Sequence, residues 1–372
     1  MSSGYSGDWY QGLSGLEQLE NDWRSLHVSA SLFARYEWNY SAAKHLTEDE
    51  SNLWFYRMRD NSGQVIAIVP SVTTVYKINP FGNLRALVMG ANDHLDGFDV
   101  PMHHSAEPAL VANSLVNAME KHSFRWQVAV WPRAFESSNV LKIWPHLRLA
   151  WTIDAPAEQC NTFQTDFRED GPKSQCVFPI PSSKLRNNLA RYRKRLNAMG
   201  EISIRSGREL NCMFSYYEEF LRIEASGWKG RSGAGTAISL NSRREAYHAS
   251  LLKHDRPDYR PDVLLLCCND KPIAGRILIT TSECIYSCKT AYDEEYAKGS
   301  PSNVLLQHVL DTAMQETTTT SVNLLTEQSA SEQWGPTIER TWQLVLFRDP
   351  FRPTLLRAAR RLLKTIRNRK SS

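Results

Sequence analysis

The same order of predicted elements occurs twice along this chain, and that order limits the folds open to it. Periodicities of two and of 3.6 residues mark the strands and helices. In the first half they give strands at Leu53–Met58, Val65–Tyr76 and Leu87–Met89, a helix at Pro108–His122 and a strand at Trp126–Trp131. In the second half they give strands at Val263–Cys268, Ile273–Thr281 and Cys284–Thr290, a helix at Ser302–Gln315 and a strand at Ser321–Leu325. No residue-level repeat accompanies this order. It predicts an α/β (α+β) fold of two pseudo-duplicated halves, each a mixed sheet flanked by helices.

Length and composition agree with two domains. At about 150 residues per domain, a chain of 372 residues has room for two. Residues 155–173 lack periodicity and carry Pro, Asn, Asp and Gly, so we expect them to connect the halves. The predicted organisation is an N-terminal half at 1–154, this connector, a C-terminal domain at 174–350 and a basic amphipathic helix within 351–372.

Charge and cysteine usage exclude several classes of protein. The net charge of +4 is too small to indicate DNA binding. The seven cysteines are odd in number and include no C-x-x-C pair, which argues against disulfide frameworks and zinc ribbons. No signal peptide and no apolar run of about 18 residues is found. We therefore expect a cytoplasmic protein with reduced thiols and no bound metal.

The turn before the helix at 302–315 is the first candidate site. Ser300 can be the N-cap and Pro301 the first helical residue, where its missing N–H has no consequence. A helix start offers unpaired N–H groups and the positive end of a dipole, which suit a pyrophosphate. The sequence predicts a cofactor-binding turn made of Lys298, Gly299, Ser300, Pro301, Ser302 and Asn303. The alternative is an ordinary capped helix.

Three segments carry a resemblance to a known family. They are the Arg-rich stretch Lys184–Leu196, the stretch Glu224–Gly230 continuing to Gly235–Ile238, and Tyr292–Tyr296 followed by Ser300-Pro301 and Val304–Leu306. A weaker match is Asn92–Asp96. With these segments the chain resembles the CelD-like group of GNAT-fold acyltransferases, and more distantly the FemAB peptidyltransferases, over about residues 90–345. It departs from the family pattern in having Ser302 after Pro301, where the family has Gly, and in lacking a clean aromatic-Lys pair near 327–333.

The resemblance implies a tandem GNAT-like fold with the donor in the C-terminal half. The implied donor is acyl-CoA, most simply acetyl-CoA. The acceptor would be an amine or hydroxyl on a small molecule or saccharide, in an exopolysaccharide or cell-envelope setting, with direct acyl transfer. Two alternatives stay open. One is an aminoacyl-tRNA-dependent FemAB-like transferase. The other is a non-catalytic GNAT-fold binding protein of polysaccharide synthesis.

The predicted catalytic residues are Glu224, Glu327 and Tyr292. Either carboxylate is a candidate general base, and Tyr292 is a candidate acid for the leaving thiolate. Because an unpaired Glu is usually exposed, a solvated carboxylate is the competing interpretation of Glu224. Trp228 and Lys229 are predicted to bind substrate; packing of a loop and a solvated lysine are their alternatives.

A polar cluster in the first half includes Asp93, His94 and Asp96, followed by Asp99, His103 and His104. Its residue types suit a metal, but its spacing matches no defined motif, so no metal is expected. We expect Asp93 and Asp96 to line the acceptor cleft as polar loop residues.

Two basic helices complete the list of candidates. The helix at 184–196 carries a positive face suited to CoA phosphates, tRNA or an anionic glycan, or simply to solvent. The helix at 353–369 suits an anionic membrane surface, which would place the protein at the periphery of the inner membrane; packing on the protein's own core is the alternative.

Overall fold

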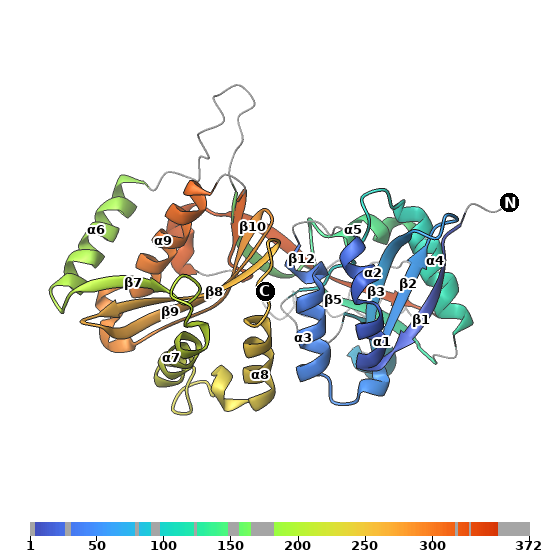
Figure 1. Cartoon of the computed structure of the whole chain (residues 1–372), viewed down its shortest axis with the longest axis horizontal. Helices are drawn as coiled ribbons and strands as arrows, with labels where there is room; N and C mark the ends of the chain where they lie inside the picture. The colour runs from blue at the N-terminus through green and yellow to red at the C-terminus, as the bar shows by residue number, and fades with distance from the viewer. Residues whose placement is uncertain are drawn as a thin grey trace, which may run out of the picture. The chain divides into compact units, whose positions relative to one another are not determined.

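The computed structural model describes residues 4–26, 31–78, 82–90, 97–122, 125–147, 156–164, 182–316, 319–326 and 329–348. Contacts divide the chain into two compact units (Figure 1). Unit 1 comprises residues 1–158 and 340–372, and unit 2 comprises residues 159–339. Each unit has its own sheet and its own apolar core.

The sheet of unit 1 has the strand order β1-β2-β3-β4-β5-β12. Its β4 and β5 are parallel, and its other neighbours are antiparallel. The strands are β1 Ser6–Gln11, β2 Leu53–Arg59, β3 Val65–Ile78, β4 Gly82–Met89, β5 Val128–Phe135 and β12 Thr337–Phe347. The α-helices are α1 Gly12–Gln18, α2 Glu20–Ser25, α3 Tyr36–Leu46, α4 Pro108–Lys121 and α5 Asn139–Ile143. Short 3-10 helices are η1 Leu32–Ala34, η2 Glu50–Asn52 and η3 Trp144–His146.

Alternation along β2 explains how helices cover both faces of this sheet. Phe55 contacts Trp23 of α2 edge to face, whereas its neighbour Tyr56 bonds Ser114 of α4. Successive side chains of a strand point to opposite faces, so α2 and α4 lie on opposite sides. On α4 the buried residues Val111, Leu115 and Met119 recur every four positions and form the stripe that meets the sheet.

The sheet of unit 2 has the strand order β6-β11-β10-β9-β8-β7, with β10 and β11 parallel and the other pairs whose registers are described antiparallel. The strands are β6 Pro156–Gln164, β7 Ile202–Ser206, β8 Tyr259–Cys268, β9 Lys271–Thr281, β10 Cys284–Tyr292 and β11 Ser321–Asn323. The α-helices are α6 Ser183–Asn197, α7 Met213–Ser226, α8 Ser242–Leu251 and α9 Pro301–Gln315. Short 3-10 helices are η4 Ile238–Leu240, η5 Glu294–Gly299 and η6 Ser329–Trp334.

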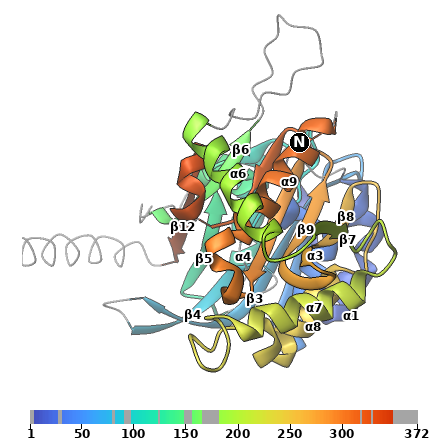
Figure 2. The same ribbon diagram turned by 90° about the vertical axis from the view of Figure 1, so that its left-hand side faces the viewer.

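Two helices lie on each face of this sheet. Figures 1 and 2 show α7 and α8 on one face and α6 and α9 on the other. The Ser182 side chain accepts the Leu185 N–H at 3.2 Å and so caps the start of α6. Leu185, Leu189 and Leu196 are buried, whereas the basic side chains of this helix stay exposed.

The predicted duplication is confirmed, because both units order their corresponding strands in the same way. Two strands were missed. The periodicities predict no strand at residues 6–11, where β1 lies, and the predicted connector begins with β6. Neither segment has a clear apolar alternation, so each is a strand because of its neighbour rather than its own pattern.

The predicted domain limits also differ from the observed units. In sequence β6 follows the first half, yet it pairs with β11 of unit 2. In the same way β12 follows the second half, yet its paired residues 341–347 belong to unit 1 and bond β5. A connector at 155–173 and a C-terminal domain ending at 350 therefore do not match the units. Strand exchange of this kind leaves no local signal, because pairing joins residues far apart in sequence.

Several predictions fall outside the described residues. They are the helix at 353–369 and the residues Asp93, His94, Asp96 and Glu327. The sequence also predicts strands at 149–153 and 177–180, which lie outside the described residues too. Within the described ranges, none of the helices has both the length and the apolar character that crossing a bilayer requires.

Candidate functional site

The start of α9 lies just after the end of β10 in unit 2. The pairing of β10 with β9 shifts register between Ser287 and Lys289, which marks a β-bulge. A bulge leaves one residue unpaired and bends its strand, and bulges are common beside functional sites. The 3-10 helix η5 follows, and Ser300 then turns the chain into α9 with φ of 43°.

The backbone at this helix start leaves one amide open. The Ser300 carbonyl accepts the N–H groups of Asn303 and Val304, at 3.0 and 3.3 Å. Pro301 has no N–H to offer. Ser300 is the N-cap and Pro301 the first helical residue, as predicted, but the Ser300 side chain caps no backbone amide. The Ser302 N–H therefore remains without a partner among the described residues.

Neighbouring segments cover the other parts of the predicted turn. A Cβ at Gly299 would collide with the Leu196 side chain of α6, so glycine is required for helix packing and not for a phosphate. The Asn303 amide is buried and already paired, because its Nδ2 donates to Ser300 Oγ at 2.8 Å and its Oδ1 accepts the Trp334 indole N–H at 3.0 Å. The Lys298 side chain is exposed. The helix start is thus closed toward α6 and open at Ser302.

Ser302 faces a cavity of about 250 Å³. This cavity is lined by Ile223, Glu224, Gly227, Trp228, Lys229, Thr290, Ala291, Tyr292, Ser302 and Thr326. Ser302 Oγ and Thr290 Oγ1 are buried, and neither finds a hydrogen-bond partner within the described structure. Unpaired buried hydroxyls are unfavourable, and they often mark a place that a ligand fills.

Glu224 is buried rather than solvated, so the competing interpretation of a solvated carboxylate is wrong. Only 3% of the residue is exposed. Its Oε1 accepts from Lys229 Nζ at 3.0 Å, and its Oε2 accepts the Ile238 N–H at 2.8 Å. Lys229 Nζ also donates to the Thr290 carbonyl at 3.2 Å, so this lysine is not solvated either. The Glu224 carboxylate thus links α7 both to Lys229 in the following segment and to the start of η4.

The glycine-rich loop inside that segment is tightly bonded to itself. The Trp228 carbonyl accepts the Ala234 N–H at 2.7 Å, and the Lys229 carbonyl accepts the Ala237 N–H at 2.8 Å. A Cβ at Gly233 would overlap the Trp228 carbonyl, so only glycine permits this approach. Trp228 itself is 59% exposed at the cavity wall, so it is not a buried packing anchor.

Tyr292 and Glu327 complete the predicted catalytic set. Tyr292 ends β10 and lines the cavity, and its hydroxyl forms no hydrogen bond to the residues that the structure describes. Glu327 lies outside the described residues, although Thr326, directly before it, lines the cavity. The structure therefore brings Glu224, Trp228, Lys229, Tyr292 and Ser302 to one place.

Sequence reasoning missed two titratable groups in this region. Arg276 on β9 is 1% exposed, and His248 on α8 is 6% exposed. Burial, with Lys289, Arg244 and Lys229 nearby, holds the pKa of His248 well below its usual value. An arginine inside the apolar run Ile273–Ile279 was a visible signal, because a charged residue in a buried strand requires an explanation. The position of His248 had no such signal.

The structure describes only part of the polar cluster in the first half. Asp93 and Asp96 are not described, so their predicted role stays a prediction. Asp99 is 4% exposed, and its Oδ1 accepts the N–H groups of Val100 and Asn139, both at 2.8 Å. His103 bonds Ser105 and stacks near His104. Among the described side chains, no group of three acidic, His or Cys residues could hold a metal ion.

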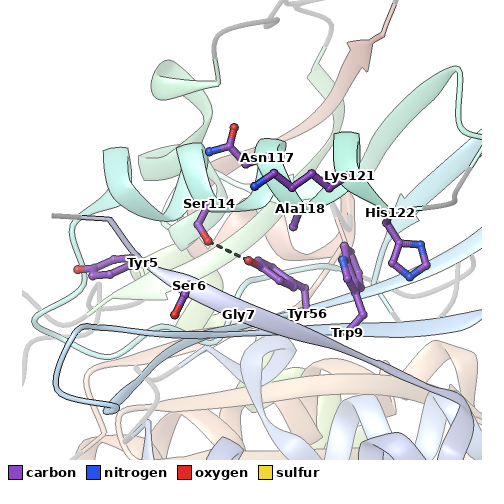
Figure 3. A pocket seen from close by; sticks show the side chains of 10 residues that line it. All are labelled: Tyr5, Ser6, Gly7, Trp9, Tyr56, Ser114, Asn117, Ala118, Lys121 and His122. Atoms are coloured by element: carbon purple, nitrogen blue, oxygen red, sulfur yellow. Dashed lines mark hydrogen bonds between the residues drawn. The ribbon is translucent and has the colours of Figure 1, made fainter. Parts of the chain in front are cut away.

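Unit 1 has a cavity of its own, of about 410 Å³ (Figure 3). Its lining comes from β1, β2 and α4 together with the residues next to them: Tyr5, Ser6, Gly7, Trp9, Tyr56, Ser114, Asn117, Ala118, Lys121 and His122. The Tyr56 and Ser114 hydroxyls bond each other at 3.0 Å across it, and Trp9 packs against Tyr56 with ring centroids 4.9 Å apart. Among the described residues, the lining of this cavity includes no carboxylate, and it lies toward the C-terminal end of α4 rather than at the start of the helix.

Comparisons with known proteins agree with this geometry. Residues 183–335, all within unit 2, match the family model described as "Acetyltransferase (GNAT) domain". No curated protein matches the sequence.

Solved structures share the fold over nearly the whole chain. FemX aligns at 10% identity with a TM-score of 0.54, over 89% of this chain and 96% of FemX. L-PGS from Bacillus licheniformis aligns at 12% identity with a TM-score of 0.52, over 93% and 96%. The C-terminal domain of a putative lysylphosphatidylglycerol synthetase from Agrobacterium fabrum aligns at 12% identity with a TM-score of 0.51, also over 93% and 96%. These likenesses concern the fold alone. The chain thus folds as a tandem of two GNAT-like α/β units, and the part of its second half at residues 183–335 is similar to the GNAT acetyltransferase domain family.

Proposed function

We propose that unit 2 transfers an acyl group, acetyl in the simplest case, from acyl-CoA to an amine or hydroxyl. One observation carries this proposal: a single cavity contains the open start of α9, the Glu224–Lys229 pair and Tyr292. A helix start binds phosphate oxygens through its N–H groups and its dipole. The cavity leads from that point toward groups able to move protons.

The chemistry requires three events around one carbonyl carbon. The acceptor nitrogen or oxygen attacks the thioester carbon and loses a proton, and the C–S bond breaks. The departing thiolate takes a proton, for which the unpaired Tyr292 hydroxyl is placed at the end of β10. Donors aimed at the carbonyl oxygen stabilise its developing charge. The unpartnered hydroxyls of Thr290 and Ser302 are available for such contacts.

Glu224 is our candidate for receiving the acceptor's proton. Each of its oxygens has one partner, which leaves lone pairs for a further donor. The ion pair with Lys229 holds this carboxylate in the cavity wall, where an acceptor could contact it. Glu327 remains a second candidate through its place after β11.

Exposed Trp228 supports a ring-bearing acceptor. A large apolar face at the cavity rim suits the flat face of a sugar, which also agrees with the sequence resemblance to cell-envelope saccharide enzymes. We therefore propose a saccharide or amino-sugar acceptor.

Binding of CoA is the direct test. Titration by calorimetry, with thermal unfolding in parallel, should show saturable binding, and the midpoint of unfolding should rise with ligand concentration. Acetyl-CoA with a panel of amino sugars should then release free thiol. A protein that shows no heat and no stabilisation at millimolar CoA would reject the donor assignment.

An aminoacyl-tRNA donor is the second candidate, and the exposed basic face of α6 favours it. This face consists of Lys184, Arg186, Arg191, Arg193, Lys194 and Arg195. Binding of tRNA to it would weaken steeply with salt. Exchanging Arg191 and Lys194 for Glu should then abolish tRNA binding and leave CoA binding intact. A protein that binds CoA but turns over no acceptor would instead support the non-catalytic binding role.

A further inference from the structure

Arg276 is a buried cation directly beneath the first turn of α9. It lies on β9, on the sheet face shared by Ala274 and Leu278, which pack into the core with α9. Its Nη1 donates to Ser287 Oγ at 2.7 Å, and its Nη2 donates to the Ser302 carbonyl at 3.3 Å. Its Nε is buried and donates to nothing in the described structure. The guanidinium thus joins β10 to the residue whose amide is open.

No acidic side chain among the described residues compensates this charge. Arg276 forms no ion pair, although other arginines of unit 2, such as Arg260 and Arg208, contact carboxylates. Burial alone lowers the pKa of Arg276 to about 10. Transfer of a charge out of water is costly unless a counter-charge compensates it.

The surroundings make this charge still less favourable in the free protein. The start of a helix carries partial positive charge, and Arg276 bonds into that first turn. A neutral amide could donate to the same two oxygens at lower cost. The hydrogen bonds therefore do not explain the charge.

We infer that Arg276 is a specificity-determining residue for an anionic donor, and that its charge compensates a diphosphate seated at the Ser302 amide. The inference rests on the proposed function, because acyl-CoA supplies the diphosphate. Arg276 does not touch the ligand. It acts through the first turn of α9, by positioning the Ser302 amide and by raising the electrostatic potential there. The unfavourable charge of the free protein becomes favourable once the anion is bound.

Two variants separate charge from shape. Arg276→Gln keeps donors for Ser287 and Ser302 without the charge, and Arg276→Lys keeps the charge. We expect Arg276→Gln to bind CoA about 10- to 100-fold more weakly, as for loss of an interaction with a charged group. Its unfolding midpoint without ligand should stay level or rise, because a desolvated charge has been removed. Arg276→Lys should bind CoA within a few-fold of the unchanged protein.

A second ligand and a control variant identify the cause. Pantetheine has no diphosphate, so its binding should be the same in all three proteins. Arg260→Gln removes a partly buried arginine that pairs with Glu316 at 3.2 Å. We expect this control to lower the unfolding midpoint and to leave CoA binding unchanged, which is the opposite pattern to Arg276→Gln.

The outcomes separate this inference from the proposed function. If the unchanged protein binds no CoA, the donor assignment and the Arg276 inference both fail. If it binds CoA and Arg276→Gln binds equally well, only the Arg276 inference fails. If Arg276→Gln loses stability and weakens CoA and pantetheine alike, Arg276 has a structural role and the inference is wrong.

Discussion

Two helices occupy the same place in the two units, yet their surroundings differ in charge. The helix α4 follows β4 and the helix α9 follows β10, which is the corresponding strand of the other sheet, and both helices begin with a proline. Glu107 immediately precedes α4, whereas Ser300 precedes α9. In unit 1 the strand β3 carries no arginine and pairs with β4 without a register shift. In unit 2 the strand β9 carries Arg276, and β10 has a bulge.

This difference indicates where an anion can bind. Glu107 places a negative charge beside the α4 start and would repel a phosphate, while Arg276 attracts one to the α9 start. The two helix dipoles are alike, so the neighbouring side chains determine which helix start can bind an anion. A duplicated fold therefore need not have a duplicated site, because function depends on particular side chains and not on the order of strands.

Placing a negative charge in each helix start should give the largest contrast. Ser302→Asp and Ala109→Asp change the residue after the proline in α9 and in α4. We expect Ser302→Asp to weaken CoA binding by about 100-fold or more, because like charges in contact cost several kcal/mol. An acidic residue in the first turn favours the helix itself, so neither variant should unfold. Equal losses of CoA affinity in the two variants would contradict the assignment of the donor to unit 2.

Each unit also has a buried glutamate in an ion pair, which allows a second contrast. Glu37 of α3 accepts from Arg24 at 2.7 Å, and Glu224 of α7 accepts from Lys229 at 3.0 Å. Either Glu→Gln variant should lower the free energy of unfolding by roughly 1–3 kcal/mol, since the remaining cation is partly exposed. Only Glu224→Gln should also lower kcat/KM, by about 100-fold, if Glu224 moves the acceptor's proton. A full loss of turnover in Glu37→Gln would show that unit 1 takes part in catalysis.

The units should respond to pH in opposite directions. Burial raises the pKa of Asp99 in unit 1 to about 6, so the folded protein holds a proton that the unfolded chain releases near pH 4. The free energy of unfolding should therefore fall as the pH rises from 4 to 6, by at most about 3 kcal/mol. In unit 2 the pKa of His248 is lowered instead, so its effect on stability is opposite. The free energy of unfolding should fall as the pH drops below about 6.5, the pKa of histidine in the unfolded chain.

Urea unfolding across pH 4 to 8 checks this pair of effects. Asp99→Asn should reduce the decrease in the free energy of unfolding as the pH rises from 4 to 6. His248→Gln should reduce the decrease in the free energy of unfolding as the pH falls below about 6.5. A profile that Asp99→Asn leaves unchanged would show that another group causes the fall.

Two buried hydroxyls should give the smallest effects. Ser114 in unit 1 bonds Tyr56, whereas Thr290 Oγ1 in unit 2 has no partner among the described residues. Ser114→Ala should lower the free energy of unfolding by about 1 kcal/mol and leave turnover unchanged. Thr290→Val should leave stability level or slightly higher, because it removes an unsatisfied group, and should lower kcat/KM several-fold. Reduced turnover in Ser114→Ala would assign a functional role to the cavity of Figure 3.

Much of the fold and part of the site could be predicted from the sequence. The helices α4, α6 and α9 have strong 3.6-residue patterns, and each forms close to its expected limits. The turn at Ser300-Pro301 was predicted from residue types that favour a helix start. By contrast, an apolar stripe that begins at Leu210 predicts a helix from about residue 209, but α7 begins at Met213 and Leu210 is 59% exposed.

Local patterns in the sequence predicted most of the strands and helices, the faces that they bury and the place where α9 begins. These properties depend on residues within a few positions of one another, so a local pattern records them. Contacts between distant residues account for the rest. In the tertiary structure β6 pairs with β11 of unit 2, and β12 pairs with β5 of unit 1. There too Glu224 is buried against Lys229, and Arg276 lies beneath Ser302 without a carboxylate partner among the described residues. Strand pairing, burial and electrostatic partners join distant residues, and no local periodicity contains them.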